Sequence, residues 1–86
     1  MLSSRLSDLP LGAQGTVLGV SARAGGAHPA DDQMLHRLGE LGFLPGEPVH
    51  LLRRGPGGRE PIAVQIGETL FALRLVEAQC VEVSVP

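Results

Sequence analysis

The sequence predicts a small, mainly β protein, with five short strands curled into a barrel and one short α-helix inserted between the first and second strands. Two observations lead to this fold class. Short segments in which apolar and polar residues alternate are separated by Gly and Pro, as is typical of strands and turns. One segment, around residues 32–41, has apolar residues at helical spacing instead. Five short strands in one chain of 86 residues remove exposed edges by curling into a barrel.

The predicted strands share β-branched residues, alternating burial patterns and boundaries rich in Gly and Pro. They are Gln14–Val20, Pro48–Arg54, Pro61–Ile66, Thr69–Arg74 and Cys80–Val85. Gly67-Glu68 fits a tight hairpin turn between the third and fourth strands. Leu75–Gln79 is too short for a full helix, so we expect one 3₁₀ turn there. No repeat and no second domain is visible, and residues 1–86 are predicted to form one domain.

The helix is predicted to begin after Asp31 and to end at Gly42. Asp31 can cap the first turn through its side-chain oxygen, and Gly42 tolerates the backbone conformation that ends a helix. An apolar stripe faces the core. Its members are Met34, Leu35, Leu38 and Leu41. Residues 21–30, before the helix, are rich in Gly and Ala and are predicted to form a flexible loop within the domain.

The helix and the turn after it carry a family resemblance. The run Arg37-Leu-Gly-Glu-Leu-Gly-Phe-Leu-Pro-Gly46, followed by a strand, resembles the signature of FeoA, the small cytosolic companion of the bacterial ferrous iron transporter FeoB. Three further stretches agree with the family in the right order. They are Leu6–Gly12, Arg53–Ile62 and Ala72–Ala78. The resemblance covers nearly all of residues 5–85 and implies an SH3-like barrel. The main departure is the stretch 21–30, which is longer than the family needs.

The resemblance implies a non-enzymatic accessory protein of ferrous iron uptake, which contacts FeoB at its GTPase domain or its membrane-embedded part. The turn after the helix and the basic turn after Arg53 suggest the contact surface. The residues expected to contact the partner are Leu38, Leu41, Phe43, Leu44, Arg53 and Arg54. An alternative is open for each group: Phe43 and Leu44 close the core under the helix, and the arginines, with Arg59, form a solvated turn.

One set of side chains has the spacing of metal ligands. Asp32, His36 and Glu40 are four residues apart and form one stripe of the helix, with His28 upstream to complete the shell. A carboxylate and an imidazole at this spacing can share a divalent cation such as zinc, which we expect to bind weakly or to bridge a weak homodimer. No cofactor is required by this hypothesis. The alternative is a solvated helix face.

Charge and aromatic content exclude two kinds of partner. The net charge is −2, and all seven basic residues are arginine, of which only Arg53, Arg54 and Arg59 cluster. Nucleic-acid-binding domains gather basic residues on one face, so we expect no nucleic acid partner. Phe43 and Phe71 are the only aromatic residues. Without Trp or Tyr, the chain cannot line the groove with which SH3 domains bind proline-rich peptides.

The remaining observations concern catalysis and compartment. No nucleophile–base order, phosphate-binding loop or cysteine pair accompanies the three histidines, so we expect no enzymatic activity. No apolar run is long enough to cross a bilayer and no signal peptide is visible, which predicts a cytoplasmic protein without direct membrane insertion. Cys80, the single cysteine, is expected to be a buried apolar residue of a strand.

Two other functions stay open. The first is a stand-alone SH3-like regulatory domain similar to the C-terminal domain of iron- or manganese-dependent repressors. The second is a small β-barrel that binds RNA or ribosomes, against which the acidic net charge argues. A gene for a large transporter GTPase beside this one would favour the accessory protein.

Overall fold

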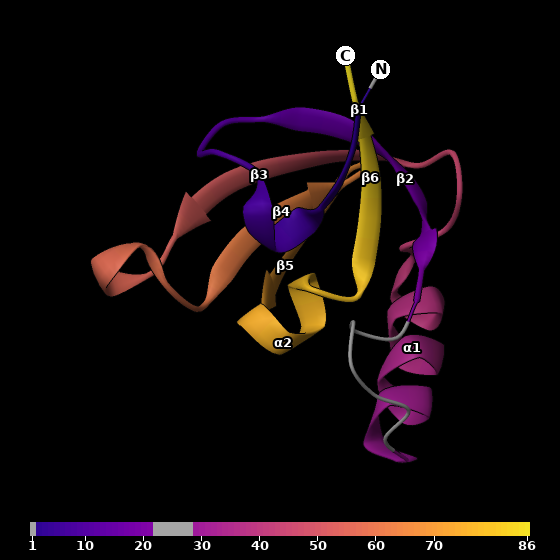
Figure 1. Cartoon of the computed structure of the whole chain (residues 1–86). Coiled ribbons are helices and arrows are strands. Elements are labelled where there is room, and N and C mark those ends of the chain that lie inside the picture. The colour runs from indigo at the N-terminus through magenta and orange to yellow at the C-terminus, as the bar shows by residue number, and fades with distance from the viewer. Residues whose placement is uncertain (1, 22–28) are drawn as a thin grey trace.

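Six antiparallel strands form one curled sheet in the computed structural model, which describes residues 2–21 and 29–86 (Figure 1). The strands are β1 (Leu2–Arg5), β2 (Gln14–Val20), β3 (Pro48–Arg54), β4 (Ile62–Ile66), β5 (Thr69–Leu73) and β6 (Val81–Val85). The helices are η1 (Leu6–Asp8), α1 (Pro29–Leu41), η2 (Pro56–Gly58) and α2 (Leu75–Ala78). The strand order is β1-β6-β2-β3-β4-β5, so β1 and β5 are the two edges of this ladder.

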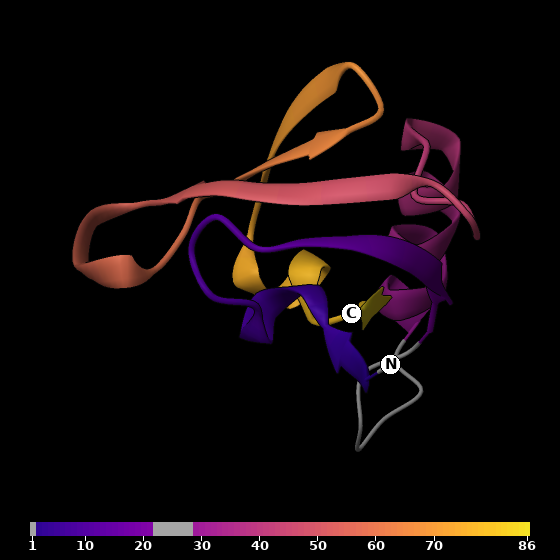
Figure 2. The ribbon, with the colours of Figure 1, turned by 90° about the horizontal axis from the view of Figure 1, so that it is seen from above.

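The order of the strands brings the two ends of the chain together. β6 lies between β1 and β2, and Leu2 is paired with Val85 across the β1–β6 ladder. Figure 1 shows the two termini side by side at the top of the molecule. β3, β4 and β5 follow one another as hairpins, and Figure 2 shows the β4–β5 hairpin on the side away from the termini. The last strand thus joins the first strand to the rest of the sheet.

Alternating side chains on the strands make the core. Ile62, Val64 and Ile66 of β4 are buried while the residues between them are partly exposed, as expected for a strand with one covered face. Leu38 of α1 and Phe43 after it complete the core from the end of the sheet where α1 lies. The Phe43 ring meets Phe71 of β5, with 5.6 Å between ring centroids. The core therefore extends from α1 to the β5 edge.

Several predictions about the fold need correction. The sheet has six strands, since β1 was not predicted, and the helix therefore follows the second strand. Among the described strands the ladder is open, so the sheet keeps two edges, β1 and β5, which the predicted barrel would have removed.

The helices also differ from the prediction. α1 begins at Pro29, within the predicted flexible loop, because Pro is well suited to the first turn of a helix. Residues 22–28 of that loop lie outside the described residues. α2 is one α-helical turn, not the predicted 3₁₀ turn.

Candidate interaction surface

Backbone hydrogen bonds fix the end of α1 and decide which of the two apolar residues after Gly42, Phe43 or Leu44, is buried. Gly42 has φ 115°, the Gly42 N–H bonds Gly39 O at 3.1 Å, and the Phe43 N–H bonds Leu38 O at 3.1 Å. This pair of bonds is the Schellman motif, in which the residue after the glycine packs against the last helical turn. Leu38 and Phe43 are each only 1% exposed, whereas Leu44 is 49% exposed.

The expected partner contacts therefore change at this end of the molecule. Leu38 and Phe43 belong to the core, and neither can touch a partner while the domain is folded. Leu41 is partly buried against the same core, and Leu44 presents its side chain to solvent. The turn that carries Leu44 is held to β2, because the Gly46 N–H bonds Val17 O at 2.8 Å. Of the predicted partner contacts at this end, only Leu44 is an exposed side chain, and it lies on a turn that is held in place by backbone hydrogen bonds.

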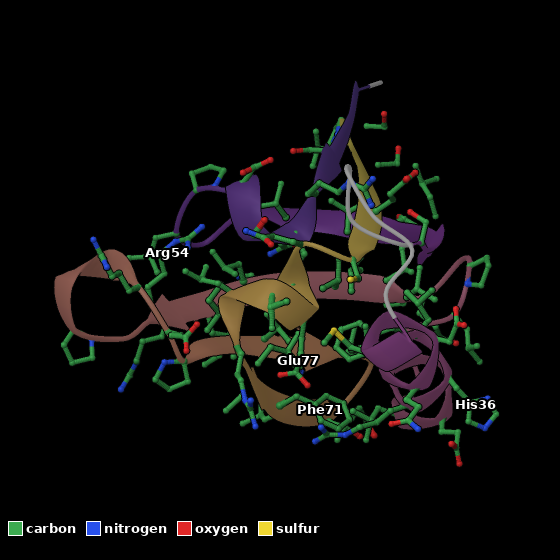
Figure 3. All side chains as sticks on the ribbon, turned by 60° about the horizontal axis from the view of Figure 1, so that its bottom comes forward. His36, Arg54, Phe71 and Glu77 are labelled. Carbon is green, nitrogen blue, oxygen red and sulfur yellow. The ribbon has the colours of Figure 1, made fainter. Side chains whose placement is uncertain are left out.

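The two adjacent arginines of β3 have different surroundings. Arg54 donates from Nη2 to the backbone oxygens of Ser7, at 2.8 Å, and Leu9, at 2.7 Å. It thus fastens the η1 segment to β3, and Figure 3 shows it beside that segment. Arg53 is exposed, as is Arg59 on the other side of the η2 turn. Arg54 is consequently a structural residue, which corrects its place among the expected partner contacts, and Arg53 remains.

The stripe of predicted metal ligands is only partly brought together. His36 Nε2 lies 3.1 Å from Glu40 Oε1 on the exposed side of α1, and Figure 3 shows His36 pointing away from the sheet. Asp32 is exposed one turn earlier, and His28 lies outside the described residues. Within the described part of the chain, no group of three or more His, Cys, Asp or Glu side chains could hold a metal ion. Zinc takes four ligands at a structural site, so this helix offers an incomplete set.

A hollow between α1, α2 and the β4–β5 hairpin contains a buried carboxylate, that of Glu77, which was not among the predicted site residues. Its volume is about 290 Å³, and Arg37, Arg74 and Glu77 help to line it. Glu77 Oε2 lies 3.2 Å from Arg37 Nη1, and Glu77 Oε1 accepts the Arg74 N–H at 2.8 Å. The ion-pair partner of Glu77 thus comes from α1, 40 residues earlier in the chain.

This carboxylate joins the two helices and does not resemble a catalytic group. The Glu77 side chain is 8% exposed and both of its oxygens are bonded, one to the Arg37 guanidinium and one to the backbone N–H of Arg74, the residue before α2. Together the two bonds fix the position of the carboxyl group between α1 and α2. Arg37 was not predicted to have a role, because its partner is distant in sequence. Figure 3 shows Glu77 between α2 and the β5 side of the molecule.

Comparison with solved structures gives the class of protein. The chain is 43% identical to FeoA of Stenotrophomonas maltophilia, solved in complex with zinc and described as a prokaryotic SH3 domain protein. That match covers 94% of this chain and 89% of the other, with a TM-score of 0.79. FeoA of Chlorobium tepidum is 32% identical, with 95% and 70% coverage and a TM-score of 0.73. This is therefore an SH3-like domain.

The family follows from the sequence. A model of the FeoA domain matches residues 4–85, and the chain belongs to the FeoA family, which is associated with ferrous iron transport. The family is one of small accessory domains and not a known enzyme family.

A manganese-dependent transcriptional repressor is also similar in structure, at 25% identity and a TM-score of 0.77, over 98% of this chain and 42% of the repressor. None of the curated proteins matches the chain. In the residues described, no helix has the length and apolar character to span a membrane.

Proposed function

We propose that this protein is an accessory factor of ferrous iron uptake that acts in the cytoplasm by binding the transporter FeoB, without chemistry of its own. The observation that carries the proposal is membership of the FeoA family over residues 4–85. The small SH3-like fold supports a binding role, because its described surface offers exposed apolar side chains, Leu44 among them, that can anchor a partner.

The contact surface that we propose consists of two parts. The first is the turn after α1, where Leu44 projects beside the partly buried Leu41. The second is the η2 turn with its exposed arginines, Arg53 and Arg59. An exposed leucine on a rigid turn loses little conformational freedom on binding, and an unpaired arginine can bind an acidic partner. FeoB would meet these two turns at its GTPase domain or at the cytosolic face of its membrane part.

Binding to purified FeoB tests this proposal directly. The chain is immobilised, and FeoB is added with and without guanine nucleotide, using Leu44→Ala and Arg53→Glu as contact variants. Leu11→Ala is the matched control, since Leu11 is 66% exposed and lies outside both turns. We expect saturable binding that the contact variants weaken about tenfold, or by 1.4 kcal/mol, and the control leaves unchanged. If folded native protein fails to bind FeoB in every nucleotide state, the proposal is wrong.

A divalent metal such as zinc is a second proposed ligand, bound weakly through His36 and Glu40 with help from Asp32 and His28. Because one helix supplies too few ligands, the remaining positions would come from a second copy, which gives a metal-bridged homodimer. The FeoA of Stenotrophomonas maltophilia was solved with zinc, which motivates the test. Isothermal titration with zinc should show weak binding that is lost in His36→Ala. Equal binding by the variant would exclude this site.

The match to the manganese-dependent repressor favours one alternative, a regulatory SH3-like domain of the kind found in metal-dependent repressors. The two functions differ in their partner. A domain of a repressor would be indifferent to FeoB and would bind a DNA-binding domain instead. The FeoB experiment therefore separates the two functions, because folded protein that does not bind FeoB would favour the repressor-like function.

A further inference from the structure

β5 is an edge strand without the usual protection. It is the last strand of the ladder and, among the described strands, pairs with β4 alone. Residues 69–73 contain no charge and no proline. Leu70 is 66% exposed and Ala72 is exposed as well. Edge strands normally carry a charge, a proline or a bulge that discourages pairing with another chain, so an apolar edge of this kind invites a partner strand.

The hairpin geometry shows which backbone groups face that partner. The β4–β5 turn has two residues, and Ile66 is paired with Thr69 on either side of it. In a two-residue hairpin this pair exchanges hydrogen bonds, and every second pair does the same. Phe71 is therefore bonded to β4, whereas the N–H and C=O groups of Leu70 and Ala72 point to the open edge. Their side chains lie on the outer face of the sheet, opposite Phe71.

The residues that flank β5 make this edge complementary to itself. Glu68, in the β4–β5 turn, directly precedes the strand, Arg74 directly follows it, and both residues are exposed. Neither side chain makes an ion pair within the described part of the chain. When two copies of β5 run antiparallel about a two-fold axis at Phe71, Leu70 lies opposite Ala72 and Glu68 lies opposite Arg74, twice over. Opposite charges at facing positions favour this register over shifted ones.

We propose that the protein pairs with a second copy of itself through β5, so that the two sheets continue into one. The interface is isologous, as expected of a two-fold dimer. Arg74 limits its length, because the Arg74 N–H and C=O hold Glu77 and α2 and are not free to extend the strand. A five-residue edge gives a weak dimer that depends on protein concentration. The exposed charge pairs make it weaker at high salt. It needs no metal.

Charge reversal tests both the surface and the register. Glu68→Arg alone places two arginines opposite each other, and Arg74→Glu alone places two glutamates opposite each other. Sedimentation velocity in the presence of EDTA should show that each variant dimerises at least about tenfold more weakly than the native chain. A mixture of the two variants should form a heterodimer, because each end then pairs an arginine with a glutamate. Thermal melting by circular dichroism confirms that each variant is folded.

A matched pair of leucine variants checks that the edge itself is used. Leu70→Lys should abolish dimerisation, while Leu11→Lys should not, and both leucines are 66% exposed in the monomer. The proposal is overturned if the native chain stays monomeric at about 1 mM, which corresponds to −4.1 kcal/mol. It is equally overturned if the two charge variants, when mixed, associate no better than either does alone. Loss of FeoB binding in Leu70→Lys, with a monomeric native chain, would assign the edge to the transporter instead.

Discussion

β1 and β5 are both edge strands of the same sheet, but only β1 carries polar groups that protect an edge. β1 contains two serines and ends at Arg5, whose Nη1 lies 2.9 Å from Ser21 Oγ and 3.4 Å from Glu82 Oε1. β5 consists of apolar residues and threonine, with Leu70 exposed. One edge of the sheet is therefore protected and the other is open, and the open edge lies on the side away from the termini (Figure 2).

The largest effect is expected from removing the support of the β5 edge. Phe43→Ala deletes a ring that is 1% exposed and packs on Phe71 of β5. We expect a loss of about 3–5 kcal/mol in the free energy of unfolding, measured by urea denaturation. Leu11→Ala is the exposed control and should change stability by less than about 0.5 kcal/mol. A loss below about 1 kcal/mol in Phe43→Ala would show that the ring does not hold this edge.

A smaller effect is expected from the segment that follows β1. Arg54→Ala removes two hydrogen bonds from a guanidinium to backbone oxygens of that segment, and should lower the free energy of unfolding by about 1.5–3 kcal/mol. The neighbouring Arg53→Ala removes an exposed side chain, and should change it by less than about 0.5 kcal/mol. Equal effects of the two variants in urea denaturation would contradict the structural role of Arg54.

The smallest effect is expected at the β1 edge itself. Arg5→Ala breaks an ion pair whose side chains are 30% and 42% exposed, so solvent screens it and we expect a loss of only about 0.2–1 kcal/mol. The difference from the native protein should shrink in 1 M salt. Since Ser3 and Ser4 remain, the variant should not associate more than the native chain in sedimentation velocity. New association would show that Arg5 is the group that protects this edge.

The strands with strong alternation were predictable from sequence, and β1 was not. Gln14–Val20 and Pro48–Arg54 have the predicted bounds, and the other three predicted strands agree with β4, β5 and β6 within one residue at each end. β1 has only four residues with two serines at its centre, and it becomes a strand because β6 offers it a ladder. Pro29 was available as a signal for the start of α1, but the Gly- and Ala-rich residues before it favoured a loop.

The candidate surface was harder to predict because it depends on contacts between distant segments. Arg53 and Arg54 look alike in the sequence, but the register of β3 with β4 shifts between Leu51 and Arg53. Such an irregularity changes which of two neighbours faces inward, and no local pattern reports it. Similarly, Phe43 and Leu44 follow the same glycine, and the Schellman hydrogen bonds decide that only Phe43 is buried.

The pairing of Leu2 with Val85 has a consequence for how this domain can be combined with others. Two paired strands are about 5 Å apart, so a host protein could leave one end and resume at the other with almost no gap in its own backbone. Neighbouring ends of this kind are what domain insertion and circular permutation require. The fold can thus be grafted into a surface loop of a larger chain as a self-contained unit, with the β5 edge still turned outward on the opposite side.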